Sequence, residues 1–438
     1  MAKNYELDMT QGSLLKKMIL YSIPLMFTSL LQSLYNAADI VVLGRFAGSG
    51  ALASVGATSS IINLMLNLFI AISIGTGVVI AKSYGAKDFL KTQRALHTSV
   101  FIALIFGTIA MLIGLIFAKP ALLLMQTPKE IIDGSVLYMR IFFMGAPASL
   151  VYNFGAMAIR SMGDTKRPLI FLTISGIANV VLNLVFVIVL KMSVAGVALA
   201  TTISQYISAI LILSSLIKSK GYSHLDIKKL RIHKKEISEI IKIGIPAGIQ
   251  GMVFSFSNVL IQSTVNSFGP AYVAGSSAAS NIENLVYVVV NSGYHASVTM
   301  VGQNYGAKKM DRVNKSIGVC LSFVLVVGLI AGGLVMIFAK DLLGIYTTDI
   351  DVIQKGAERL TLLSLFYIIC GMMDTLVGGT RGLGNSFIPM VVAILGVCGV
   401  RIVWLYTVFK MLPTFTMLFI SYPVSWAVTG LIQLICFL

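Results

Sequence analysis

The chain alternates long apolar runs with short polar links, and this pattern predicts α-helices rather than β-strands. Each run is bounded by charged residues, Gly or Pro. Each also reaches or exceeds the ~20 residues that a helix needs to cross a bilayer. We predict twelve transmembrane helices over residues 15–43, 52–82, 93–118, 132–160, 167–190, 194–217, 237–267, 271–304, 314–339, 353–380, 387–410 and 414–437.

Composition supports an all-α integral membrane protein. Of the 438 residues, 57% are hydrophobic and only 11% are charged, whereas soluble domains carry about 25% charged residues. The formal net charge of +16 does not indicate nucleic-acid binding, because the basic residues lie in the links, where they orient the protein and contact anionic lipid. We therefore expect membrane lipids as partners and no nucleic acid.

The distribution of basic residues predicts the orientation. If the N-terminus is cytoplasmic, the links on that side contain 23 of the 33 Lys and Arg residues, against 8 on the opposite side. Because cytoplasmic links are enriched in Lys and Arg, we expect both termini in the cytoplasm and a multi-pass protein of the plasma (cytoplasmic) membrane.

The sequence also repeats itself. The four residues Tyr84–Lys87 recur as Tyr305–Lys308, 221 positions later, and Pro24 matches Pro246. We predict an N-terminal six-helix lobe (1–217), a basic cytoplasmic linker (218–236) and a C-terminal six-helix lobe (237–438). Because six is even, both lobes enter the membrane from the same face and form parallel repeats, the architecture of transporters with a site between or within two bundles.

Three acids lie inside predicted membrane helices and away from the helix ends, at Asp39, Glu283 and Asp374. A carboxylate at the bilayer centre costs ~2.5–3.5 kcal/mol on insertion scales, so such residues usually face a cavity or a partner. They could bind cations, relay protons or attract a cationic substrate. The alternative is a structural role for each, protonated or paired with a basic residue such as Arg140 or Arg401.

Two amides add to this picture. Asn179 and Asn183 are four residues apart and share one helix face. Together with a carboxylate, they suit Na⁺ or a proton-linked network, although interhelical hydrogen bonding is the alternative. In the repeat, Asp374 corresponds to Asn153, and the position matching Asp39 carries no charge, so the two lobes differ chemically.

Three common enzyme motifs are absent from the sequence. It contains no GxxxxGK[ST] phosphate loop, no HExxH and no nucleophile elbow. An ion-driven transporter and a membrane-embedded, lipid-linked enzyme or scaffold remain, with a channel as a third class. The duplicated halves and the isolated acids favour the transporter.

Several motifs resemble those of the multidrug and toxic compound extrusion (MATE) family. They are Tyr35–Asp39, the two Tyr-Gly-Ala-Lys segments, Gly302–Asn304, Arg160–Thr165 and Arg381–Ser386. The resemblance covers nearly the whole chain. It implies two six-helix lobes arranged as a V and a monomer without a cofactor. It also implies export of cationic, amphipathic small molecules by alternating access, in exchange for Na⁺ or H⁺.

The resemblance also implies site residues. Cation coupling would fall to Asp39, Asn179 and Asn183, with Asp39 as the metal ligand if the ion is Na⁺. Many relatives carry Asp at the position of Asn183, so Asp39 is the only acid of this group and the choice of ion stays open. We predict the substrate cavity from Tyr35, Asn36, Asn153, Glu283 and Asp374. The alternative is a flippase for anionic, lipid-linked oligosaccharides, whose cavity should contain several Arg or Lys residues.

Overall fold

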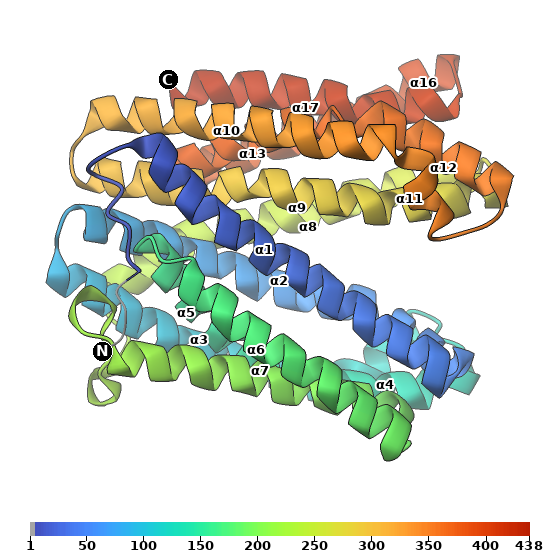
Figure 1. Ribbon diagram of the computed structural model, residues 1–438, viewed down its shortest axis with the longest axis horizontal. Coiled ribbons are helices and arrows are strands. Elements are labelled where there is room, and N and C mark those ends of the chain that lie inside the picture. Colours follow the sequence, from blue (N-terminus) through green and yellow to red (C-terminus); the bar gives the residue numbers. More distant parts are fainter. Residues whose placement is uncertain (1–4) are drawn as a thin grey trace. The chain divides into compact units, whose positions relative to one another are not determined.

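The computed structural model describes residues 5–438, which are almost entirely helical and contain no strand (Figure 1). The first half of the chain forms helices α1 (Leu14–Val42), α2 (Ser49–Gly85), α3 (Phe89–Leu124), α4 (Lys129–Met144), α5 (Ala146–Ser161), α6 (Lys166–Leu184) and α7 (Ser193–Lys218). Helices α1 and α6 each end in a π-helical turn, at Leu43–Ala47 and Val185–Val189.

The second half follows after a linker with two short 3₁₀ turns, Gly221–Ser223 and Ile227–Lys229. Its helices are α8 (Lys234–Asn266), α9 (Pro270–Gly306), α10 (Met310–Ile337), α11 (Ala339–Gly344), α12 (Ile350–Leu363), α13 (Tyr367–Gly382), α14 (Phe387–Ala393), α15 (Val400–Tyr406), α16 (Val408–Met411) and α17 (Phe415–Phe437). A π-helical turn at Ile394–Gly399 joins α14 to α15.

Each of the twelve predicted runs is helical in the structure. Within the described residues, nine helices and two bent helix pairs are long and apolar enough to cross a membrane. The more polar α9, which is 37 residues long, completes the set.

Two of the runs bend sharply, unlike the single helices that we predicted. Residues 132–160 bend by 45° between α4 and α5, and residues 353–380 bend by 48° between α12 and α13. Pro147, in the first turn of α5, has no backbone N–H to continue α4. Between α12 and α13, the Ser364 hydroxyl donates to the Leu360 carbonyl at 2.6 Å, a bond that often bends helices.

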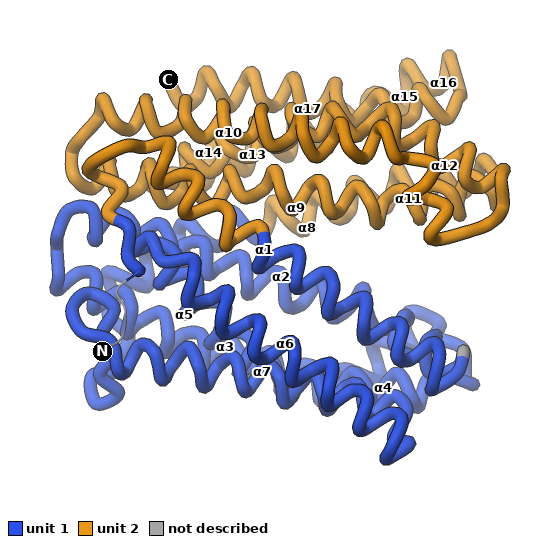
Figure 2. The backbone as a smooth tube through the Cα atoms, in the orientation of Figure 1, with its two compact units in different colours: residues 1–7, 27–248 blue, residues 8–26, 249–438 orange. Residues whose placement is uncertain are grey.

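The chain forms two compact units (Figure 2). Unit 1 contains the described residues up to Leu7 and Phe27–Gly248, and unit 2 contains Asp8–Met26 and Ile249–Leu438. These units differ from the predicted lobes, which end at 217 and begin at 237, because the linker belongs to unit 1 and the units change within α1 and α8. Each boundary between the units lies two residues after a proline in the interior of a helix, Pro24 or Pro246, where a backbone hydrogen bond is missing.

Small residues bring the helices of each unit close together. In unit 1, a Cβ atom on Gly107 of α3 would lie 2.4 Å from the Pro147 backbone in α5. In unit 2, a Cβ atom on Gly378 of α13 would lie 2.5 Å from the Tyr294 carbonyl of α9. In a bilayer, such close backbone packing replaces the hydrophobic effect as a source of helix association.

Candidate functional site

Unit 1 contains a cavity of about 390 Å³ that is lined mainly by polar side chains. Five helices contribute residues at spacings of three and four, so each presents one face to the cavity. These residues are Gln32, Tyr35, Asn36 and Asp39 on α1, Asn67 and Ile70 on α2, Ser149, Tyr152 and Asn153 on α5, Leu172, Ser175, Gly176 and Asn179 on α6, and Thr201, Ser204, Gln205 and Ser208 on α7.

Asp39 is the centre of a hydrogen-bond network in this cavity. Its carboxylate accepts one bond from the Asn183 amide and another from the Thr201 hydroxyl at 3.4 Å. Asn183 also donates to the Asn179 oxygen at 3.3 Å, and Asn179 donates to Thr201 at 3.4 Å. The structure thus brings together the three residues predicted for cation coupling and adds Thr201, which the sequence analysis missed.

One acceptor in this network has no partner. The Oδ1 atom of Asn183 is buried and makes no hydrogen bond within the described part of the chain. Buried polar atoms without a partner are rare and call for a physical explanation. Here the orphan oxygen belongs to the amide that contacts the Asp39 carboxylate.

Close packing of α1 on α6 makes the network possible. A Cβ atom on Gly176 would lie 1.9 Å from the ring of Tyr35, so only glycine leaves room for that ring. The Tyr35 hydroxyl donates to the Thr173 carbonyl of α6 at 3.5 Å. Glycine at position 176 therefore lets the face of α1 that carries Asp39 approach α6.

The predicted cavity residues of the first half also lie here. Tyr35, Asn36 and Asn153 all line the cavity that contains Asp39, and Asn153 donates to the Ser149 carbonyl at 2.8 Å. Asp39 is the only acidic or basic residue among the lining residues. The cavity of unit 1 consequently carries at most one charge, which is negative.

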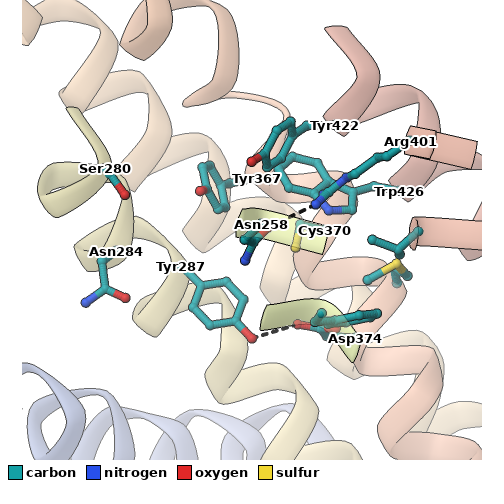
Figure 3. Close-up of a pocket in the computed structure, with 13 residues that line it drawn as sticks. Asn258, Ser280, Asn284, Tyr287, Tyr367, Cys370, Asp374, Arg401, Tyr422 and Trp426 are labelled. Carbon is teal, nitrogen blue, oxygen red and sulfur yellow. Dashed lines mark hydrogen bonds between the residues drawn. The ribbon is translucent and has the colours of Figure 1, made fainter. Parts of the chain in front are cut away.

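Unit 2 has a cavity of its own, of about 330 Å³ (Figure 3). Asp374, predicted as a cavity residue, lines it and accepts hydrogen bonds from Tyr287 and Asn291, each at 3.3 Å. The remaining lining residues are Phe254, Asn258, Ser280, Asn284, Tyr287, Tyr367, Cys370, Met373, Val397, Arg401, Tyr422 and Trp426. Aromatic side chains therefore form much of the wall.

Arg401 lines the same cavity. Its guanidinium donates to Asn258 and Ser425, each at 3.2 Å, and lies 3.8 Å from the centre of the Tyr422 ring. It makes no ion pair with an acid in the part of the chain described. The suggestion that Arg401 neutralises a membrane acid is therefore wrong.

Glu283 does not line either cavity, which corrects its prediction as a cavity residue. It is 1% exposed, and its carboxylate accepts two bonds from Arg359, at 2.8 and 2.7 Å. Tyr367 donates a third bond at 3.2 Å, and Arg359 also donates to Ser276. This partner was not predicted, because Arg359 lies near the start of the predicted helix 353–380 and was counted with the basic residues on the side of the membrane opposite the N-terminus.

The described residues contain no metal site formed by several His, Cys, Asp or Glu side chains. No group of three or more His, Cys, Asp or Glu residues there could hold a metal ion. A cation in unit 1 would therefore be bound by one carboxylate together with neutral amide and hydroxyl oxygens.

Comparison with known proteins agrees with the internal repeat and identifies relatives of the whole chain. The MatE family model matches the chain twice, over residues 24–185 and 246–407, and these two matches confirm the internal repeat. The probable multidrug resistance protein YpnP of Bacillus subtilis (strain 168) is 29% identical over 380 residues, covering 86% of this chain and 84% of that protein. YoeA of the same organism, also described as a probable multidrug resistance protein, is 26% identical over 437 residues, or 97% and 93% of the two chains.

Solved structures share the fold. The outward-facing structure of a multidrug resistance MATE family transporter of the MOP superfamily matches with a TM-score of 0.91 at 20% sequence identity. The match covers 100% of this chain and 98% of that one.

Proposed function

Because the chain belongs to the MatE family of membrane transporters, we propose that it exports cationic, amphipathic small molecules by alternating access, in exchange for Na⁺ or H⁺. In this proposal it works as a monomer in the plasma membrane with both termini in the cytoplasm. Its relatives YpnP and YoeA are both described as probable multidrug resistance proteins, which supports efflux of several compounds.

The observation that carries the proposal is the charge of the unit 1 cavity. Asp39 is its only acidic or basic lining residue, so the cavity favours a cation over a neutral or anionic compound. A flippase for an anionic, lipid-linked oligosaccharide would need basic side chains at this place. None of the residues that line this cavity is Arg or Lys, which argues against that alternative.

The surroundings of Asp39 support its role in coupling. Carboxylate and amide oxygens suit a hard cation, and Asn179, Asn183 and Thr201 supply neutral oxygens within one network. Rotating the Asn183 amide by half a turn would direct its orphan Oδ1 atom toward the carboxylate, in place of the N–H group. Protonation of Asp39 is the alternative, and it would remove the same negative charge.

In the proposed cycle, the loss and return of the negative charge on Asp39 link the movement of the exported compound to that of the coupling cation. In the outward-open state, neutralisation of Asp39 by a cation weakens the attraction between the cavity and a cationic compound, which is released. The coupling cation then leaves toward the cytoplasm as a new compound enters. The membrane potential supplies ~2.3 kcal/mol per charge per 100 mV.

Drug efflux from proteoliposomes tests this proposal. The purified protein is reconstituted, and efflux of a fluorescent cationic dye is followed under an imposed Na⁺ gradient alone and then a pH gradient alone. We expect one gradient to drive efflux and Asp39→Asn to abolish it. The control is Asp133→Asn, an exposed acid on α4 of the same unit, which should leave efflux unchanged. Full efflux by folded Asp39→Asn protein would refute the coupling role.

A further inference from the structure

We propose that the linker between α7 and α8 is held on α3 by a latch of two neutral histidines, His97 and His233, and that protonation of these histidines releases it. This inference goes beyond the proposed export function, because it gives residues 226–233 a pH dependence that neither cavity requires. Three of the four histidines of the chain, His97, His224 and His233, lie in this linker or on the part of α3 that it contacts.

His97 can hold the linker only in its neutral form. Its side chain is buried, at 4% exposure, and its Nε2 atom accepts the backbone N–H of Asp226 at 3.0 Å. The proton of the neutral ring must therefore be on Nδ1, which donates to the Gln93 carbonyl at 2.7 Å. Because both ring nitrogens of a protonated histidine are donors, a proton on Nε2 would face the Asp226 N–H and break this bond.

His233 has the same arrangement at the other end of the segment. Its Nε2 atom accepts from the Arg231 guanidinium at 3.2 Å, so Nδ1 carries the proton and donates to the Thr98 hydroxyl oxygen at 3.1 Å. The backbone N–H of His233 donates to the same oxygen at 3.2 Å. Protonation removes the acceptor for Arg231 and places two positive charges side by side. Both ends of the loop 226–233 thus meet on one turn of α3, at His97 and Thr98.

The charges around the latch set the direction of the pH dependence. Burial, followed by the charge of Arg231, lowers the pKa of His233 below its usual value of ~6.5. Arg94 and His97 act in the same direction, whereas Glu236 in the first turn of α8 opposes them. A histidine whose pKa is lower when the loop is docked stabilises docking above pH ~6.5, and this contribution is lost as the pH falls below that value.

The acid of the loop, Asp226, is already engaged elsewhere. Its carboxylate accepts the backbone N–H of Lys228 at 3.0 Å and pairs with Lys229 at 3.3 Å. The Lys228 bond holds the pKa of Asp226 below its usual value, with smaller contributions from the charges of Lys229 and His224. Asp226 therefore stays ionised while histidines titrate, and its backbone N–H is the group that the latch holds.

His224 provides a contrast within the same linker. Its Nδ1 atom lies 2.9 Å from the Ser219 carbonyl oxygen, an acceptor that a neutral ring and a protonated ring can both serve. Protonation of His224 therefore costs no hydrogen bond. This difference separates the proton-sensitive contacts of His97 and His233 from an ordinary histidine bond to the backbone.

The latch lies just before the helix in which the chain passes from unit 1 to unit 2. The loop leads directly into α8, which contains the boundary between the units after Gly248. The ion pair between Lys91 of α3 and Glu239 of α8, at 2.9 Å, involves no histidine and keeps α8 itself in place. Release is therefore local, and it lengthens the unrestrained chain in front of α8. In the proposed orientation this loop is cytoplasmic, so the latch responds to cytoplasmic acid.

Hydrogen exchange of the backbone amides at the two ends of the loop tests the inference. The purified full-length protein in detergent is labelled in D₂O between about pH 5 and 8, the range in which histidine titrates. Exchange at Asp226 and His233 is resolved by mass spectrometry with fragmentation and corrected for the pH dependence of intrinsic exchange. We expect protection of both amides to fall roughly tenfold per pH unit below pH ~6.5, as expected for one titrating histidine at each end. The Ser219 amide, which donates to the Ser215 carbonyl, is the internal reference and should keep its protection.

Matched variants assign the effect to the two histidines. His97→Gln keeps a side-chain oxygen that can accept from Asp226 but cannot titrate, so protection of the Asp226 amide should lose its dependence on His97. The double variant His97→Gln/His233→Gln should show no pH dependence at either end. His97→Lys has a positive charge and no acceptor, so the Asp226 amide should be unprotected at every pH. His224→Gln is the control and should behave like the unmodified protein.

Either of two results would overturn the inference. One is protection of the Asp226 and His233 amides that does not change with pH in the unmodified protein. The other is a pH dependence that survives in the double variant. If His97→Lys does not fold, the neutral Gln variants still decide the question. The assay uses neither a substrate nor an ion gradient, so its outcome is independent of the proposed export function.

Discussion

The ion pair between Glu283 and Arg359 leads to a sharp prediction about stability. Both side chains are buried, with the carboxylate bound at 2.8 and 2.7 Å by two guanidinium nitrogens. Glu283→Met removes the negative charge with a side chain of similar length and leaves the guanidinium buried without a counter-charge. Breaking a buried pair in this way costs about 3–5 kcal/mol, a large part of the ~5–15 kcal/mol that stabilises a typical protein. We expect Arg359→Met to cost a similar amount.

The double variant separates the pair from its surroundings. In Glu283→Met/Arg359→Met, neither charge remains, and such apolar replacements of buried pairs are often close to neutral. We therefore expect the double variant to be more stable than either single variant, which gives a large coupling energy in a double-mutant cycle. The measurement is the unfolding free energy of the purified protein in mixed micelles, titrated with denaturing detergent and followed by circular dichroism.

Transport activity provides the complementary readout. Because Glu283 lies outside both cavities, dye efflux per folded molecule should be the same in the double variant as in the unmodified protein. Additive effects of the two single substitutions, or single losses below about 1 kcal/mol, would refute the role of the pair in stability. A double variant that folds normally but does not transport would show that Glu283 acts on substrate after all.

Three glycines carry further predictions. Gly176→Ala places a Cβ atom 1.9 Å from the Tyr35 ring, and this overpacking should lower the unfolding free energy by about 1–3 kcal/mol. Gly56→Ala, with open space around it, should instead stabilise α2 by about 0.5–1 kcal/mol. Equal unfolding free energies for these two variants would contradict the close packing of α1 on α6. Gly163→Ala forces alanine to a φ of +92° and within 2.3 Å of the Leu7 carbonyl oxygen, so proteolysis near Leu7 should become faster; unchanged cleavage would argue against that contact.

Much of the fold could be predicted from the sequence because hydrophobic length is a direct requirement of the bilayer. All twelve predicted runs correspond to helices, and the repeat of Tyr84–Lys87 as Tyr305–Lys308 anticipated the two family matches. The bend between α12 and α13 was not predicted, because hydropathy does not depend on helix direction. The change of unit within α1 and α8 was also missed, because it depends on which helices pack together after each proline, and a hydropathy pattern contains no such information.

The candidate site could be predicted only in part, for a similar reason. Asn179 and Asn183 were found because residues four apart share a helix face, and the cost of a membrane carboxylate pointed to Asp39. Thr201 lies on another helix and was missed, although the spacing of the polar residues at 201, 204, 205 and 208 is a usable signal for a cavity face. The partner of Glu283 could not be identified, because periodicity gives a residue's face and depth but not the residue opposite it.

The two cavities show how a duplicated fold can separate two chemical tasks. Both units inherit related helices, so each can form a cavity at an equivalent place, but the charges differ. Unit 1 presents one carboxylate surrounded by amides and hydroxyls, whereas unit 2 presents a carboxylate together with Arg401. A free cation gains less in unit 2, because the guanidinium already supplies a positive charge to that cavity. Cation coupling is therefore expected to depend on Asp39 and not on Asp374, so Asp374→Asn should change which compounds are exported while leaving the dependence of efflux on the ion gradient intact.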